Sequence, residues 1–401
     1  MLEPIVPTDF KLRDLAQATF SVAETLGKEL HPLTLAAIRE LLRTVNSYYS
    51  NLIEGHDTHP IDIDRAMKKE FSKDSRERNL QEEAKAHIEV QIEMEKRLEQ
   101  DSSMNVCSVD FLRWLHREFY ERIPDELRVV RNPETGRTER VIPGELRSFD
   151  VRVGRHLPPV HSEVMDMLGR LGDAYDSTKH KGASALVILS AAHHRILWVH
   201  PFGDGNGRMI RMVSDAYLMQ SGIGSHGLWT VSRGLARRKA EYLAMLDEAD
   251  SPRWNDYDGR GNLSEGALNR FCAFFLDTIR DQVEYMTGLL RIDELAERIK
   301  NYSHAREAGL LPDRFGKTDK ESRFSTKASR LLVDLFHRGK VSRSEIPDLL
   351  SLPERSARRV VRFLTDEGFV DSKSPKADLQ FRIPAHAGPY FFPDLYNPSR
   401  L

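Results

Sequence analysis

The sequence has few cysteines, almost no net charge and no long apolar run. Only Cys107 and Cys272 occur among its 401 residues, which argues against a disulfide scaffold and favours a reducing compartment. The formal net charge of −2 gives no overall field toward nucleic acid or membrane, so such a partner must be met locally. The first residues lack a basic region followed by an apolar core, and no stretch of about 18 apolar residues occurs. We expect a cytoplasmic protein without a membrane partner, and export by a non-standard route stays open.

What the chain does have is a dense run of reactive residues from His200 to Arg211, which reads HPFGDGNGRMIR. Residues 184–199 before it are apolar and contain no Gly or Pro, which predicts a buried helix that ends at the run. Residues 209–219 after it resume helical spacing. The run therefore lies at a helix N-terminus, where unpaired N–H groups and the helix dipole favour an anion.

The glycines and arginines of this run suit a polyphosphate. Gly205 and Gly207 lack a Cβ, so backbone N–H groups beside them can approach a phosphate closely. Arg208 and Arg211 are three residues apart on one helical turn and point to similar sides, as a clamp on two phosphates requires. Together these residues predict a phosphate-binding loop.

Asp204 and His200 add the remaining chemistry of the run. A carboxylate such as Asp204 is a hard oxygen ligand for a Mg²⁺ ion that bridges phosphates. His200, with an ordinary pKa of about 6.5, is mostly neutral at neutral pH and can accept a proton from a hydroxyl. Either a Gly-Asn-Gly turn or a histidine after an apolar helix is more often structural when it stands alone. The combination is what predicts a site.

The whole run resembles, without departure, the signature His-Pro-Phe-x-x-Gly-Asn-Gly-Arg-x-x-Arg of the Fic family. The resemblance implies an all-helical core, ATP and Mg²⁺ as ligands, and transfer of AMP to a protein hydroxyl with His200 as the base. In the related Doc branch, which phosphorylates its target, lysine replaces the second loop glycine, so Gly207 favours AMP transfer. The resemblance also implies ATP or phosphate contacts by Phe202, Gly203, Asp204, Gly205, Asn206, Gly207, Arg208, Arg211 and Tyr242. For Tyr242, stacking on adenine and simple packing both stay open.

A second motif lies near the N-terminus, where Ser50 and Glu54 share a helix face and Gly55 is a natural helix end. An ordinary exposed glutamate at a helix end is one interpretation. The stretch also resembles the family's inhibitory motif Ser/Thr-x-x-x-Glu-Gly/Asn, which implies that Glu54 pairs with Arg211 and holds the enzyme inactive.

Residues 124–159 break the helical rhythm. Alternation around Val151 and Val153 predicts a short hairpin, with a surface loop as the alternative. Fic proteins carry a β-hairpin flap here that holds a target segment by strand-like pairing, so the resemblance implies docking along Arg147 to His156. The implied flap residues are Arg147, Val151, Arg152, Val153 and Gly154.

The other predicted elements are mostly helical. Leu80 to Leu98 is expected as a solvated amphipathic helix, Phe111 to Ile123 as a stronger one, and Gly266 to Ile299 as one long helix. Near the C-terminus, three helices precede a two-stranded turn, an order that resembles a winged helix-turn-helix. The expected helices are Thr326 to Arg338, Ser342 to Leu350 and Pro353 to Glu367.

The last of these helices carries a basic stripe, and both DNA binding and protein docking stay open for it. Its members, spaced at i, i+3, i+4 and i+7, are Arg355, Arg358, Arg359 and Arg362.

We therefore expect a mainly α protein with a Fic-type helical core, a small β-hairpin flap and a C-terminal winged helix-turn-helix. The expected domains are an N-terminal helical region with the inhibitory motif (1–110), the catalytic core (111–300), a linker (301–325) and the winged helix (326–401). The expected function is an autoinhibited protein adenylyltransferase that modifies a Ser, Thr or Tyr hydroxyl of a target protein and of itself. A de-AMPylating enzyme and a nucleotide-sensing DNA-binding regulator are the alternatives, and a homodimer stays open.

Overall fold

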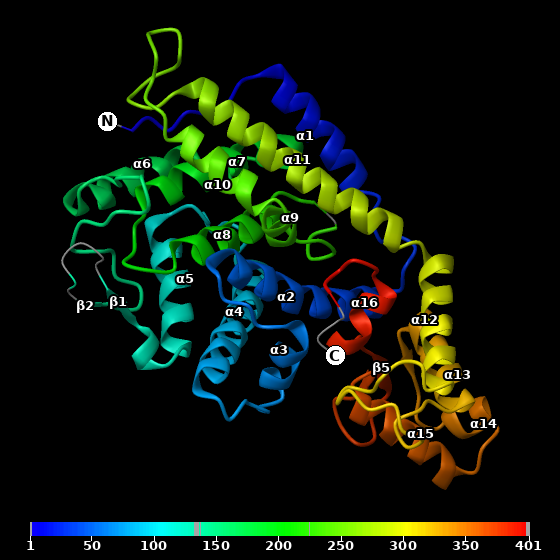
Figure 1. Cartoon of the computed structure of the whole chain (residues 1–401). Helices are drawn as coiled ribbons and strands as arrows, with labels where there is room; N and C mark the ends of the chain where they lie inside the picture. The colour runs from blue at the N-terminus through cyan, green and yellow to red at the C-terminus, as the bar shows by residue number, and fades with distance from the viewer. Residues whose placement is uncertain (1, 132–135, 137, 224, 398–401) are drawn as a thin grey trace. The chain divides into compact units, whose positions relative to one another are not determined.

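The computed structural model describes residues 2–131, 136, 138–223 and 225–397, and these are mainly helical (Figure 1). The chain divides into two compact units that are not consecutive in sequence. The first unit contains residues up to 25 together with 46–58 and 71–284, and the second contains 26–45, 59–70 and 285 onward.

The first unit is built from helices with one small sheet. Its helices are α1 (Phe10–Ala23), the end of α2 (Pro32–Glu54), α4 (Ser75–Gln100), α5 (Val109–Arg122), α6 (Val164–Ala174), α7 (Gly182–Val199), α8 (Asn206–Gln220), α9 (Val231–Arg237), α10 (Lys239–Ala249) and most of α11 (Glu265–Leu289). The sheet pairs β1 (Val129–Arg131) with β2 (Thr138–Arg140), and two 3-10 turns span Asp125–Leu127 and His161–Glu163.

The helix α7 forms the centre of this unit, as its composition predicts. It packs against α1, α6 and α8 (Figure 1), and most of its residues are buried. Among the described residues it is the one helix long and apolar enough to cross a membrane by composition, yet 72% of that window is buried inside the fold. Burial of this apolar surface holds α7 in place and so positions the loop that follows it.

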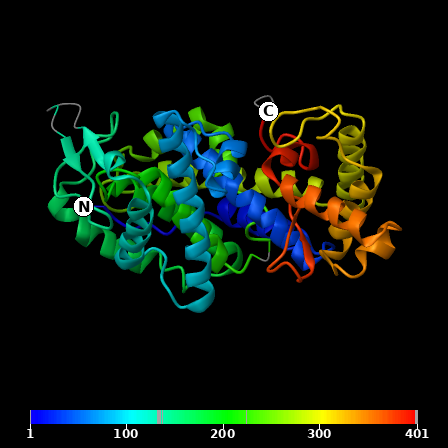
Figure 2. The same ribbon diagram turned by 90° about the horizontal axis from the view of Figure 1, so that it is seen from below.

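The second unit combines helices with a three-stranded antiparallel sheet of order β3-β5-β4. In both views α13 and α15 lie side by side next to the strands (Figure 1, Figure 2). The helices are the start of α2, α3 (Pro60–Met67), α12 (Ile292–Glu307), α13 (Thr326–Arg338), α14 (Ile346–Leu350), α15 (Glu354–Glu367) and α16 (Gly388–Phe391), with a 3-10 turn at Ala385–Ala387. The strands are β3 (Lys340–Val341), β4 (Val370–Asp371) and β5 (Leu379–Phe381).

Two predicted helices are wrong in extent. The expected single helix from Gly266 to Ile299 is two helices, because the chain is extended at Arg291 and acidic residues begin a new first turn behind it. The same second helix, α12, occupies the first seven positions of the expected linker. The helix expected from Ser342 starts only at Ile346, since β3 and a hydroxyl-bonded turn at Ser342 use the preceding residues.

The predicted hairpin lies elsewhere in the segment. Around Val151 and Val153 the structure has only an isolated bridge between Val153 and His156, whereas the two-stranded sheet is formed by β1 and β2. Alternation over three residues was too short to fix a strand, and several residues between β1 and β2 lie outside the described part of the chain.

Candidate functional site

The loop after α7 has a defined backbone course. His200 caps α7 in a left-handed conformation (φ 49°), and Gly205 adopts φ 78° where α8 begins. Asn206 braces the loop, because its Oδ1 accepts from Phe202 N (3.0 Å) and its Nδ2 donates to Phe202 O (2.9 Å). Asn206 is buried and both ends of its amide are used. It shapes the loop, and its side chain is not directed at a ligand.

The helix α5 forms the support beneath the loop. Phe202 is fully buried and stacks on His116 with ring centroids 3.9 Å apart. A Cβ at Gly205 would meet the Tyr120 ring at 2.8 Å, so this position requires glycine for space as well as for its φ. Phe202 and Gly205 therefore fit the loop to the core, and sequence reasoning did not identify His116 or Tyr120 as part of the site.

Asp204 is the exposed carboxylate of the loop. Its Oδ2 accepts from the Tyr120 hydroxyl (2.6 Å) and from Arg208 Nη2 (3.3 Å), while 46% of its side chain stays exposed. Within the described residues there is no group of three or more His, Cys, Asp or Glu that could hold a metal. The residues present fit a cation with one protein ligand and phosphates as the others. Gly203, the residue before Asp204 in the loop, lies close to Phe149: a Cβ at this position would be 3.2 Å from the Phe149 ring.

Arg208 is buried and pairs with Glu83 of α4, a contact that the sequence analysis missed. The second carboxylate oxygen of Glu83 lies 2.7 Å from His56 Nδ1. Burial lowers the pKa of Arg208 to about 10. The prediction that α4 is a solvated helix is wrong along this face, where Glu83, His87 and Gln91 are buried. Their i, i+4, i+8 spacing was the signal available in the sequence.

Arg211 is held by the end of α2 through three hydrogen bonds. Its Nε donates to Ser50 Oγ (2.9 Å), and its Nη2 donates to Ser50 O (2.9 Å) and to Glu54 Oε1 (2.5 Å). Burial acts to raise the pKa of Glu54, but the charge and hydrogen bond of Arg211 outweigh it, so the pKa is lowered and the carboxylate is ionised. Gly55 ends the helix at φ 92°. The structure thus brings Ser50 and Glu54 together with Arg211, and Gly55 ends the helix that carries them.

A pocket of about 420 Å³ opens beside this ion pair. Glu54, His200, Gly207 and Arg211 line it, so the residue predicted to be the base, the loop and the carboxylate predicted to be inhibitory share one cavity. Tyr242 forms part of the wall, where it is only 1% exposed and its hydroxyl lies 2.8 Å from His193 Nε2. Packing is therefore what the structure shows for Tyr242.

His200 is neutral in this environment. Burial lowers the pKa of His200 to about 3, and the nearby positive charges of His156 and Arg147 act in the same direction. A neutral imidazole is the form that can accept a proton. Bound phosphates would add negative charge beside it and raise this pKa toward the range of an effective base.

The segment expected to form the docking flap divides into two parts. Arg147 is buried and its guanidinium donates to the backbone carbonyls of His200 (2.8 Å), Phe149 (3.0 Å) and Pro159, so it braces the loop and offers no free side chain to a target. Val153 and Gly154 are exposed and line the pocket. The other two expected flap residues are the half-buried Val151 and the exposed Arg152, whose Nε donates to Gly154 O.

Comparison with known proteins gives the same family as the loop. Residues 106–218 match the model of the Fic/DOC family. A protein adenylyltransferase fic-1 of Caenorhabditis briggsae is 28% identical over 136 residues, which are 34% of this chain and 26% of that protein. A protein adenylyltransferase Fic of Drosophila willistoni is 31% identical over 87 residues, 22% of this chain and 18% of that protein. The chain thus matches about a quarter or less of the length of these curated relatives.

Solved structures share the fold. A Fic family protein from Desulfovibrio desulfuricans G20 superimposes with a TM-score of 0.54 at 16% identity over 94% of this chain and 97% of that one. A Fic domain containing signaling protein from Bacteroides thetaiotaomicron gives 0.51 at 21% identity over 68% and 96%. At these identities the likeness concerns the fold alone. The family match covers residues 106–218, which include the loop, and the solved structures agree with it in fold.

Proposed function

We propose that this protein is an autoinhibited protein adenylyltransferase. The observation that carries the proposal is the shared pocket. A neutral His200, the start of α8 and Arg211 face this one cavity, and Arg211 is bonded there to Glu54. The curated relatives in the comparison are named protein adenylyltransferases, and the loop agrees with their family.

In this proposal ATP places its phosphates at the N-terminus of α8, where the backbone N–H groups and the helix dipole favour negative charge. His200 accepts the proton of a Ser, Thr or Tyr hydroxyl of the target, the hydroxyl oxygen attacks the α-phosphorus, and pyrophosphate leaves. Arg208 and Arg211 stabilise the charge that develops on the phosphates. Asp204 would hold a Mg²⁺ ion, which supplies further neutralisation of the leaving pyrophosphate.

Glu54 opposes this reaction by filling the anion site of Arg211. As long as Arg211 is paired with Glu54, it cannot orient the terminal phosphate, so ATP binds without alignment of its α-phosphate for attack. Inhibition is then a misalignment of bound ATP and not an exclusion of it. About one third of the Glu54 side chain is exposed, so the carboxylate already faces solvent on the side toward which it would leave Arg211.

The experiment is ATP-dependent modification by wild-type protein, Glu54→Gly and Glu54→Gln. Labelled ATP is supplied with a cell lysate, and mass spectrometry identifies the added group and the modified proteins. We expect both variants to raise modification of the protein itself and of targets, since Gln keeps the shape of Glu54 but not its charge. His200→Ala in the Glu54→Gly background is the inactive control. Modification that stays at the wild-type level in both Glu54 variants would refute autoinhibition through this residue.

Removal of AMP is a second candidate, because Glu54 lines the same cavity as His200 and remains partly exposed there. In that reaction Glu54 would align a water for attack on a protein-bound AMP. Release of AMP from a pre-modified protein separates the two reactions. Loss of release in Glu54→Gly, without any gain of ATP-dependent modification, would favour removal over transfer.

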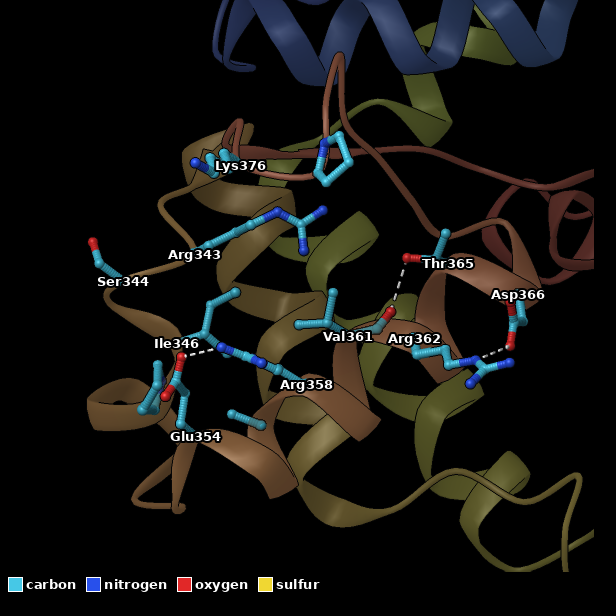
Figure 3. Close-up of a pocket in the computed structure, with 13 residues that line it drawn as sticks. Arg343, Ser344, Ile346, Glu354, Arg358, Val361, Arg362, Thr365, Asp366 and Lys376 are labelled. Atoms are coloured by element: carbon cyan, nitrogen blue, oxygen red, sulfur yellow. Dashed lines mark hydrogen bonds and ion pairs between the residues drawn. The ribbon is translucent and has the colours of Figure 1, made fainter.

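For residues 326–401 we propose a winged-helix domain that contacts a partner through α15. This unit contains a pocket of about 640 Å³. Residues of α14 and α15 and Lys376 line it (Figure 3). Two of the four exposed arginines of α15 already have acidic partners there, as Arg358 bonds to Glu354 (2.5 Å) and Arg362 lies near Asp366 (3.8 Å).

Because Arg358 and Arg362 have acidic partners, DNA binding through α15 would depend on the other two arginines, Arg355 and Arg359. Each phosphate contact contributes about −0.9 to the slope of log affinity against log salt concentration. Arg355→Ala with Arg359→Ala, made in the full chain, should therefore lower the slope by about two if this helix contacts duplex DNA. Absence of salt-sensitive binding to any duplex by the wild-type chain would favour a protein partner.

A further inference from the structure

The two arginines of the loop are held by two carboxylates of unequal freedom. Glu83, the partner of Arg208, has a side chain only 7% exposed, whereas Glu54, the partner of Arg211, is 34% exposed. Arg208 itself is nearly buried, with 6% of its side chain exposed. The Arg208–Glu83 pair is therefore an interior ion pair, and the Arg211–Glu54 pair is open to the pocket.

Glu83 is fixed at both of its oxygens. One contacts Arg208 Nη1 and the other lies 2.7 Å from His56 Nδ1, which donates in the tautomer that carries its proton on Nδ1. Burial and the positive charge of Arg208 lower the pKa of His56, so the neutral form prevails. Departure of Glu83 would leave a buried guanidinium without its counter-ion, which is strongly unfavourable. Glu83 is thus held at both oxygens, whereas Glu54 bonds to Arg211 through one oxygen at the pocket.

We propose that Glu83 is a positioning residue for ATP, one that fixes Arg208 through one η nitrogen and leaves the other directed toward Asp204 and the phosphates. Arg208 Nη2 already lies 3.3 Å from Asp204 Oδ2, on the loop side of the guanidinium. This role rests on the proposed function, since it assigns the phosphate donor of the same site. It also gives the two arginines different roles. Glu83 fixes the orientation of Arg208 before ATP binds, whereas Arg211 becomes available to ATP only when Glu54 leaves it.

A second inhibitory role for Glu83 would predict the opposite behaviour. If Glu83 competed with phosphates for Arg208, as Glu54 does for Arg211, its removal should strengthen ATP binding. If it positions Arg208, its removal should weaken ATP binding, because the freed guanidinium loses its orientation. The burial of Glu83 and its second bond to His56 support positioning.

The test is made in the Glu54→Gly protein, where Arg211 is already free. Glu83→Gln is compared with its parent by calorimetric titration with ATP and with adenosine. We expect about tenfold weaker binding of ATP, the loss of one well-oriented charged hydrogen bond, and less than about twofold change for adenosine. Glu93→Gln is the matched control on the same helix, because 47% of the Glu93 side chain is exposed and it contacts Lys96 alone among the ion pairs of the described residues.

Three results would overturn the proposal. Tighter ATP binding in Glu83→Gln would make Glu83 a second inhibitor, an equal loss for ATP and adenosine would make its role merely structural, and no change would remove it from the site. If Glu83→Gln does not fold, Glu83→Asp keeps the charge but shortens the reach, and about threefold weaker ATP binding is expected. A failure of the proposed function would give a different result from a failure of this proposal: the Glu54→Gly protein would bind ATP but transfer no AMP.

Discussion

Gly207→Ala tests the position of the inhibitory carboxylate with the smallest possible change. Gly207 lies in the first turn of α8 with ordinary helical geometry, so alanine is compatible with its backbone. A Cβ built there would overlap Glu54 Oε1 and lie 3.1 Å from Arg211 Nη1. The carboxylate is the far end of a flexible side chain, and we expect it to move away while α8 stays in place.

The size of the effect follows from the bond that is lost. A hydrogen bond to a charged group contributes about 1.5–3 kcal/mol, which corresponds to about 10–150-fold in rate if it acts only in the inhibited state. The Glu54 side chain is about one third exposed, so solvent screening places the expected gain near the lower end, at about tenfold.

The assay is the initial rate of ATP-dependent self-modification in a four-protein cycle of wild type, Gly207→Ala, Glu54→Gly and the double variant. The change in the Glu54→Gly background measures any direct cost of the new methyl group to ATP binding. The rate ratio for Gly207→Ala in the wild-type background, divided by the same ratio in the Glu54→Gly background, gives the part of the effect that acts through Glu54. If Gly207→Ala changes the rate by the same factor in both backgrounds, the methyl group does not act through Glu54 and the reasoning is refuted.

Further expected outcomes concern the base, the loop and the buried histidines. His200→Ala should lower transfer by about 10²–10⁴ with little change in ATP affinity, as a titration beside the rate assay would show. Since the pKa of His200 is lowered to about 3, kcat/KM should show no acid limb near its ordinary pKa of about 6.5 in a pH–rate profile. Asn206→Ala should weaken ATP binding and lower the melting temperature together, because two buried hydrogen bonds that hold the loop are lost. Burial lowers the pKa values of His87 and His116 to about 3, so both histidines are neutral in the folded protein where the unfolded chain takes up protons. As the pH falls below about 6.5, the free energy of unfolding should therefore decrease by about 1.4 kcal/mol per pH unit for each of the two histidines, as denaturant titration would measure.

The position of the loop between two helices was predicted from the sequence because its constraints are local. The apolar run before His200 predicts the buried helix α7, and Pro201 and the glycines determine where the chain turns after it. The pairing of Glu54 with Arg211 was also anticipated, although the two residues lie 157 positions apart. That pairing came from the resemblance of a short motif and not from any property of α2 itself.

The parts that were not predicted depend on contacts between distant elements. Nothing in the composition of α4 shows that Glu83 faces Arg208, since a glutamate on a charged helix is normally solvated. Tyr120 is likewise an ordinary member of an amphipathic helix until α5 is placed under Gly205. Arg147 was expected to face a target, but a short polar segment gives no sign that its guanidinium turns inward.

These contacts explain how a loop with two arginines remains stable before ATP arrives. Two unpaired guanidinium groups at a helix N-terminus would repel each other and oppose the helix dipole. In the structure one is paired with the interior Glu83 and the other with Glu54 at the pocket. In the proposed function, incoming phosphates would therefore displace only the Glu54 carboxylate, which would keep the cost of activation to one partly exposed ion pair.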